Sequence, residues 1–255
     1  MSFVRQTSRR RAPWFGLAIL LLLPAAPAFA DTPAGCGVTA PPRAASSTAQ
    51  AASNLGLTKQ QLIRYRCTRY DADIARVDRE AEAWIARRAP QVTRPALVLD
   101  IDETALSNWP VMYHNDFAYF RGGDCDLNST RACGQAAWER SEAAPAIAPT
   151  LELFNAAKAA GVAVFFVTGR GENPEASAAT EGNLRKAGYD GWTGIYLRPA
   201  ESREASVALY KSAARAKIEA LGYRIIANVG DQQSDLALGH AERRFKLPNP
   251  FYYVP

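Results

Sequence analysis

The chain has 255 residues, of which 48% are hydrophobic and 22% charged, a composition typical of a globular protein with a full hydrophobic core. Its formal charge of +5 at neutral pH includes four arginines within the first thirty residues, and removal of those residues leaves +1. Because a nearly neutral chain lacks the excess of basic residues that binds phosphate backbones, no nucleic acid polymer is expected as a partner.

Residues 1–30 have the three parts of a secretory signal peptide. A basic start (Arg5 to Arg11) is followed by an apolar core (Trp14 to Leu23) and a small-x-small ending (Ala28 to Ala30), which predicts cleavage before Asp31. A retained membrane anchor is the alternative, but the apolar core is shorter than the ~20 residues of a spanning helix. We therefore expect a periplasmic or secreted protein with no stable membrane anchor after signal cleavage.

Residues 31–53 are rich in Ala, Pro, Ser and Thr and predict a flexible lead-in to a main domain over residues 54–255. Thr58 has capping-box spacing and predicts the start of a helix. Apolar residues then recur at helical spacing from Ile74 to Ile85, which predicts a surface helix that continues to about residue 88.

Four cysteines follow the predicted signal peptide, at positions 36, 67, 125 and 133. An even number of cysteines in an exported chain suggests disulfides. Cys125 and Cys133 would close a short loop, so the preferred pairing is Cys125–Cys133 with Cys36–Cys67. Free buried thiols are the alternative, and none of the cysteines has zinc-ligand spacing with a histidine.

The chain from residue 96 onward alternates between apolar runs typical of strands and segments typical of helices. The expected strands are Ala96–Leu99, Val162–Val167, Ile195–Leu197 and Tyr223–Val229, and the expected helices are Leu151–Ala160, Pro174–Ala187 and Ser202 or Arg203–Leu221. This alternation predicts an α/β fold: a Rossmann-like parallel sheet with helices on both faces.

Residues 105–148 lie between the first strand and the next helix and are too long for a plain loop. We expect a small, mostly helical cap insertion above the strand ends, where its many aromatic side chains could shape a substrate pocket. The alternative is that these aromatic residues form only the insertion's own small core.

Polar side chains follow three of the expected strands, and parallel strands bring their carboxyl ends to one edge of a sheet. These side chains are Asp100 and Asp102, Thr168 with Gly169, and Asp231 with Asp235; Lys211 lies early in a helix. Clustered carboxylates require a cation, and a site made only of oxygen ligands suits Mg²⁺. A lysine and a hydroxyl beside that cation suit a phosphate group, so the pattern indicates metal-assisted phosphoryl transfer. Taken singly, each residue could instead be a turn, a cap or a solvated helix charge.

The sequences Asp-Ile-Asp-Glu-Thr (100–104), Thr-Gly-Arg (168–170), Lys211 and Gly-Asp-Gln-Gln-Ser-Asp (230–235) resemble the four motifs of the haloacid-dehalogenase-like (HAD) superfamily. The segments Gly222–Ile225 and Phe245–Pro250 narrow the resemblance to the acid phosphatases of subfamily IIIB, which include the plant vegetative storage proteins. The resemblance covers about residues 55–255.

This resemblance implies that Asp100 attacks phosphorus and forms an aspartyl-phosphate. Asp102 would protonate the leaving oxygen and then deprotonate the hydrolytic water. The carboxylates of Asp100 and Asp231 and the backbone carbonyl of Asp102 would hold Mg²⁺. Asp235 would not bind the metal directly but would orient the metal site or Lys211.

The resemblance also implies that Thr168 and the Gly169 N–H bind phosphate oxygens and that Lys211 offsets their charge. The expected function is an exported Mg²⁺-dependent acid phosphatase acting on a small-molecule phosphomonoester. A non-catalytic storage or phosphate-ester-binding protein on the same fold is the alternative. A dehalogenase is disfavoured because dehalogenases lack the acid at the position of Asp102, whereas a phosphotransferase would differ only in the acceptor.

Overall fold

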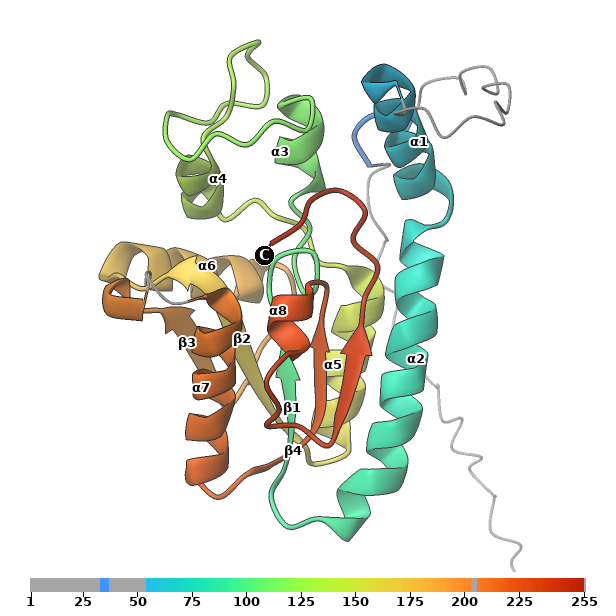
Figure 1. Ribbon diagram of the computed structural model, residues 1–255, viewed down its shortest axis with the longest axis vertical. Coiled ribbons are helices and arrows are strands. Elements are labelled where there is room, and N and C mark those ends of the chain that lie inside the picture. The colour runs from blue at the N-terminus through green and yellow to red at the C-terminus, as the bar shows by residue number, and fades with distance from the viewer. Residues whose placement is uncertain (1–32, 37–53, 203–205, 255) are drawn as a thin grey trace, which may run out of the picture. The chain divides into compact units, whose positions relative to one another are not determined.

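A computed structural model describes residues 33–36, 54–202 and 206–254, which belong to one compact unit. The predicted signal peptide and most of the predicted lead-in lie outside these residues. The unit is built on a five-stranded parallel sheet with strand order β3-β2-β1-β4-β5 (Figure 1). The strands are β1 (Pro95–Leu99), β2 (Ala163–Gly171), β3 (Gly194–Arg198), β4 (Arg224–Gly230) and β5 (Arg243–Lys246).

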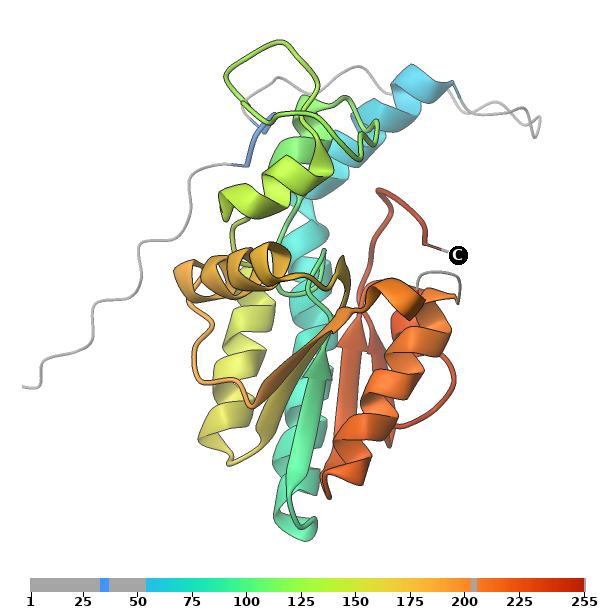
Figure 2. The same cartoon turned by 90° about the vertical axis from the view of Figure 1, so that its left-hand side faces the viewer.

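Helices cover both faces of this sheet (Figure 2). They are α1 (Leu55–Thr68), α2 (Tyr70–Arg88), α3 (Trp109–His114), α4 (Gln135–Ser141), α5 (Ala148–Ala159), α6 (Pro174–Lys186), α7 (Val207–Ala220) and α8 (Gln233–Leu236), with short 3₁₀ turns at Ala89–Gln91 and Ala200–Ser202. Side chains alternate between the two faces of a strand, so Leu97 and Leu99 of β1 join the core formed with α2 and α5. Ala96 and Val98 join the core formed with α7 on the opposite face. The predicted parallel sheet with helices on both faces is confirmed.

The first helix begins earlier than the sequence predicted. Asn54 is its N-cap, and the Asn54 side chain accepts a hydrogen bond of 3.2 Å from the N–H of Leu57. The predicted start at Thr58 is therefore wrong, because an asparagine four residues earlier satisfies the free N–H groups of the first turn.

Within the described ranges, no helix combines the length and apolar character needed to cross a membrane.

Two strands differ from the sequence prediction. β2 continues past Val167 through the Thr-Gly-Arg motif to Gly171, with a register shift against β3 between Val167 and Gly171. β5 was not predicted, because its sequence Arg-Arg-Phe-Lys is charged and only Phe245 is buried. An edge strand with one buried residue gives no apolar run to detect.

The insertion over residues 105–148 contains two short helices, α3 and α4, joined by a long irregular segment, so the prediction of a mostly helical insertion is wrong. The disulfide Cys125–Cys133 crosslinks this segment, and the side chain of Asn115 bonds to both backbone groups of Cys133 at 2.8 Å. The insertion is thus held by a crosslink and local hydrogen bonds as well as by its helices.

The second disulfide, Cys36–Cys67, ties residues 33–36 to α1, so both preferred pairings are confirmed. The carbonyl of Ala34 accepts a 2.8 Å hydrogen bond from the indole N–H of Trp109 at the start of α3. Residues 33–36, which we call the N-terminal clasp, therefore connect α1 to the insertion.

Candidate active site

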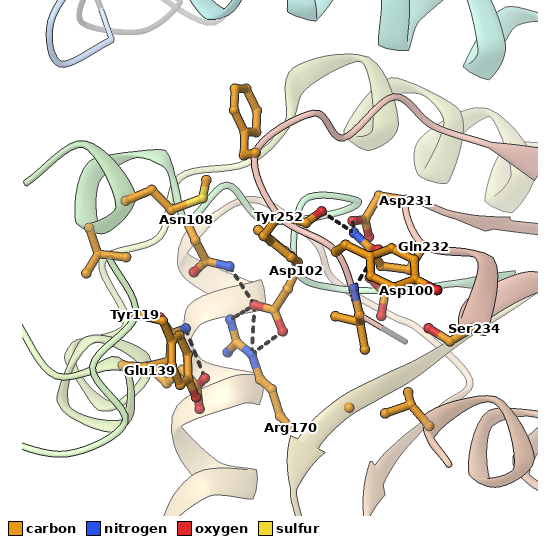
Figure 3. A pocket seen from close by; sticks show the side chains of 18 of the residues that line it. Asp100, Asp102, Asn108, Tyr119, Glu139, Arg170, Asp231, Gln232, Ser234 and Tyr252 are labelled. Atoms are coloured by element: carbon orange, nitrogen blue, oxygen red, sulfur yellow. Dashed lines mark hydrogen bonds and ion pairs between the residues drawn. The ribbon is translucent and has the colours of Figure 1, made fainter. Parts of the chain in front are cut away.

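Asp100 directly follows β1, the central strand, and its N–H still pairs with the Val229 carbonyl of β4 at 3.1 Å. Its side chain is buried at one end of a cavity of about 470 Å³. Six of the residues predicted from the sequence line this cavity: Asp100, Asp102, Gly169, Lys211, Asp231 and Asp235. The parallel sheet therefore gathers at one edge residues that are far apart in sequence (Figure 3).

Lys211, on the first turns of α7, lies between two carboxylates. Its Nζ donates to Asp100 and lies 2.6 Å from Oδ1 of Asp235. Burial would lower the pKa of Lys211, but the two carboxylates outweigh burial and raise it, so the ammonium form is stabilised. Burial raises the pKa of Asp100; Lys211 opposes this rise, and Asp235 and Asp231 add to it.

Asp231, directly after β4, is fixed by three donors. Its Oδ1 accepts from Thr104 Oγ1 at 3.2 Å, and its Oδ2 accepts from Gln232 Nε2 and Asn249 Nδ2, each at 2.7 Å. Burial and the neighbouring Asp235 raise the pKa of Asp231 to about 7 despite these bonds. Its orientation is thus set from the loop after β1 and from the segment after β5.

The carboxylates of Asp100, Asp231 and Asp235 offer oxygen atoms that all lie within 4.8 Å of one another. Three buried carboxylates around the single ammonium of Lys211 leave two negative charges when all are ionised. Such a donor set fits a hard divalent cation. Lys211 contacts Asp100 at one oxygen, whereas Asp231 and Asp235 each accept hydrogen bonds at both oxygens, so Asp100 is the carboxylate with an oxygen left for the ion.

Asp102 points into the same cavity and pairs with Arg170. The guanidinium Nη2 lies 2.7 Å from Oδ1 and Nε lies 3.1 Å from Oδ2, and Asn108 Nδ2 donates to Oδ1 at 2.9 Å (Figure 3). Burial alone would raise the pKa of Asp102, but Arg170 outweighs burial and lowers it. Arg170 is the third residue of the Thr-Gly-Arg motif, yet the sequence reasoning gave it no role.

Glu103 connects three segments around the site. Its Oε1 accepts from the backbone N–H of Asn108 at 2.5 Å, and its Oε2 accepts from Asn108 Nδ2 at 3.1 Å and from the Tyr252 hydroxyl at 2.8 Å. Glu103 has a φ of 55°, in the left-handed region, which turns the chain sharply after β1. The loop after β1, the insertion and the segment after β5 are thereby joined at one buried carboxylate.

Thr168 and Gly169 occupy different positions relative to the cavity. Gly169 lines it, and a Cβ there would meet only Val207 Cγ1, at 4.0 Å. Thr168 is fully buried, and its Oγ1 accepts a hydrogen bond of 3.2 Å from the Arg170 N–H.

Sequence reasoning also missed Asn108, Asn249 and Tyr252. Asn249 lies in the Phe245–Pro250 segment that carried the family resemblance, whereas Asn108 has no local signal.

A parallel α/β sheet whose central strand ends in an Asp-x-Asp pair, facing a buried lysine and a second pair of aspartates, is the architecture of the HAD superfamily. Residues 39–255 match the family described as HAD superfamily, subfamily IIIB (acid phosphatase). The chain belongs to this family and is a phosphomonoester hydrolase, for which the expected substrate is a small phosphate ester.

Plant proteins are among its relatives. The chain is 37% identical over 188 residues to the stem 28 kDa glycoprotein of Glycine max, a match that covers 72% of this chain and 70% of that protein. It is 36% identical to acid phosphatase 1 of Solanum lycopersicum, over 63% of this chain and 60% of that protein. It is 33% identical to vegetative storage protein 1 of Arabidopsis thaliana, over 62% of this chain and 55% of that protein. The matched part of the chain thus spans less than two thirds of the length of the last two relatives.

The fold is similar to that of the class C acid phosphatase of Bacillus anthracis. The TM-score is 0.59 at 19% sequence identity, and the match covers 77% of this chain and 86% of that chain. At this level of identity the similarity supports the fold alone.

Proposed function

We propose that this protein is an exported, Mg²⁺-dependent acid phosphatase that hydrolyses small phosphomonoesters through an aspartyl-phosphate. One observation carries the proposal: Asp100 is buried at the end of the central strand, in contact with Lys211, and shares one cavity with Asp102. A nucleophile and a second acid in the same cavity are the minimum that a two-step phosphoryl transfer needs.

In the first step, a carboxylate oxygen of Asp100 attacks phosphorus, and the bond to the ester oxygen breaks. The contact with Lys211 favours the ionised form of Asp100, which is the nucleophilic form. In the second step, water attacks the phosphorus of the aspartyl-phosphate, phosphate is released and the Asp100 carboxylate is restored.

Asp102 would give its proton to the departing alcohol and take one from the attacking water. To donate, Asp102 must first bind a proton, and Arg170 opposes this while it contacts both oxygens. The phosphate group of the substrate is an anion that can compete for the same guanidinium. We therefore infer that Arg170 turns from Asp102 toward the phosphate when substrate binds.

The carboxylates of Asp100 and Asp231 and the backbone carbonyl of Asp102 would hold the Mg²⁺, with Asp235 positioning Lys211 beside it. When bound, the ion would offset negative charge on the phosphate oxygens and on Asp100. Asp231 already has the fixed orientation that a metal ligand requires.

The Gly169 N–H, at the cavity wall, and Lys211 would bind phosphate oxygens. Thr168 is proposed for the same role, but its hydroxyl is committed to the Arg170 N–H in this structure. Thr168 would contact phosphate only after that bond is exchanged.

Export is supported by the signal-peptide pattern in residues 1–30 and by the two disulfides, since disulfides persist in oxidising compartments. Relatives named as glycoproteins are consistent with passage through a secretory pathway. We propose a periplasmic or secreted location.

The decisive measurement is phosphate release from 4-nitrophenyl phosphate by the purified protein, with Mg²⁺, with excess chelator, and with Asp100→Asn. We expect turnover that is lost with chelator, restored by Mg²⁺ and abolished by the substitution. Trapping of acid-stable radioactive phosphate on the wild type alone would support the aspartyl-phosphate. A folded, Mg²⁺-loaded chain with no turnover would instead favour a storage or phosphate-ester-binding protein.

A further inference from the structure

We propose that Glu139 selects the substrate by charge, favouring phosphomonoesters whose alcohol part carries an ammonium group over those whose alcohol part carries a second anion. This inference rests on the proposed phosphatase function and concerns the outer part of the same cavity. It assigns to the insertion a specific chemical role in recognition.

The cavity has two chemically different ends. At the inner end, on the side of Asp100 and Asp231 in Figure 3, lie the carboxylates of the proposed nucleophile and metal site and Lys211, which would bind the phosphate group. At the outer end the insertion contributes Met112, Phe117, Tyr119 and Glu139. An ester bound with its phosphate at Asp100 must therefore place its alcohol part against these residues of the insertion.

Glu139, on α4, is the carboxylate that the insertion brings to this outer end. Among the described residues, the Glu139 carboxylate accepts one hydrogen bond, from Gln135 Nε2 at 3.1 Å, and no basic group lies within ion-pair distance of it. The neighbouring Arg140 points to Glu175 instead. Glu139 therefore faces the cavity with a charge that no side chain of the described protein neutralises at contact distance.

Arg170 acts electrostatically on Glu139, but it is already paired with another carboxylate. Its guanidinium makes its ion pair with Asp102 rather than with Glu139. Burial and the charge of Asp102 raise the pKa of Glu139, whereas Arg170 and Arg140 lower it without contacting its carboxylate. A cationic group on the substrate would provide the missing partner.

The surroundings of Glu139 also suit a cation. Tyr119 lies within electrostatic range of Glu139, with which it overlaps in Figure 3, and Phe117, Tyr252 and Tyr253 contribute further aromatic surface to the cavity. The face of an aromatic ring attracts an ammonium group, and the attraction adds to that of a carboxylate. A second anion on the alcohol part would meet Glu139 and Asp102, because the two basic residues that line the cavity in the described part of the chain, Arg170 and Lys211, are both paired with carboxylates.

The test compares three esters that share one phenyl phosphate unit: 4-(aminomethyl)phenyl, 4-methylphenyl and 4-carboxyphenyl phosphate. The kcat/KM of each is measured for wild type, Glu139→Gln and Glu82→Gln. Glu82 is an exposed residue of α2, so its substitution removes the same charge far from the cavity. Comparison of ratios between proteins cancels the intrinsic reactivity of each leaving group.

We expect wild type to prefer the aminomethyl ester over the carboxy ester, and Glu139→Gln to reduce that ratio about tenfold. Glu82→Gln should keep the wild-type ratio, and Glu139→Lys should invert it. An unchanged ratio in both Glu139 variants, with turnover of the 4-methylphenyl ester, would overturn this inference alone. Absence of turnover of all three esters would overturn the proposed function and this inference with it.

Discussion

The Arg170 guanidinium donates hydrogen bonds to both oxygens of the Asp102 carboxylate, with Nη2 2.7 Å from Oδ1 and Nε 3.1 Å from Oδ2. This two-point contact, together with the hydrogen bond from Asn108, fixes the orientation of Asp102, the proposed proton donor, before substrate binds. An arginine can make such a planar fork, whereas a lysine at the same place offers only a point charge.

Arg170→Lys should therefore keep the charge but lose the orientation of Asp102. We expect kcat for 4-nitrophenyl phosphate to fall by about tenfold to a hundredfold with little change in the melting temperature. Arg185→Lys is the matched control, because Arg185 lies exposed on α6 and pairs with Glu181. Equal kcat values for wild type and Arg170→Lys would show that the fork has no part in catalysis.

Thr104→Val should weaken Mg²⁺ binding. The substitution removes the hydroxyl that donates to Asp231 at 3.2 Å while it preserves the shape of a fully buried side chain. Loss of such a supporting bond typically costs about tenfold in metal affinity. The activation of turnover by Mg²⁺ and calorimetric titration of Mg²⁺ would both report the change. Thr68→Val, on the exposed side of α1, serves as control, and an identical Mg²⁺ dependence for all three proteins would show that the bond from Thr104 does not support metal binding.

Asp78 should make stability depend on pH. It is buried between α2 and α5, where Thr150 Oγ1 donates to Oδ2 at 2.9 Å, and burial raises the pKa of Asp78 to about 7. An unfolded chain loses this proton near pH 4, so between about pH 4 and 7 the folded protein retains a proton that the unfolded chain has released. Folding above pH 7 must bury the charge, and stability falls as pH rises through this window.

Asp78→Asn removes that charge. The difference in unfolding free energy between variant and wild type should shift in favour of the variant by a few kcal/mol, on the order of 4 at most, from pH 4 to pH 8. Urea unfolding across this range measures it, with the exposed Asp71→Asn as control. A difference that does not vary with pH would mean that Asp78 titrates alike in both states.

The N-terminal clasp should stabilise the insertion. The Cys36–Cys67 bridge spans 31 residues, and loss of a crosslink of this length typically costs about 4 kcal/mol. In Cys36→Ala/Cys67→Ala we expect that loss in urea unfolding, together with faster amide exchange in α3, because Trp109 would lose a tethered partner at Ala34. Amide exchange in β1 should change only as much as the loss of global unfolding free energy predicts. If α3 in the variant exchanged its amide protons as slowly as in the wild type, the N-terminal clasp would not support the insertion.

The sequence was sufficient to predict four of the five strands and six of the residues that line the cavity. β1 is a short apolar run that ends at Asp100, and the same pattern recurs before Asp231, so the parallel topology brings both carboxylates to one edge. These features are local: β1 and β4 each carry an apolar run that is followed directly by an aspartate.

What the sequence could not predict depends on contacts between distant segments. The pairing of Arg170 with Asp102 joins residues separated by 68 positions, and the bond from Tyr252 to Glu103 joins residues separated by 149. Nothing in the local pattern around Asn108 distinguishes it from an ordinary surface asparagine. Such partners are chosen by the folded geometry, and only the packed insertion and the segment after β5 define them.

The junction at Glu103 has a consequence for how this fold can diversify. Asn108 of the insertion bonds to Glu103 and Asp102 in the loop after β1, while Asp100 and Asp231 follow strands of the sheet. A lineage could therefore replace most of the insertion, and with it the leaving groups that the enzyme accepts, provided that a residue able to dock on these two carboxylates is retained. Substrate range and catalytic power would then evolve as separable traits.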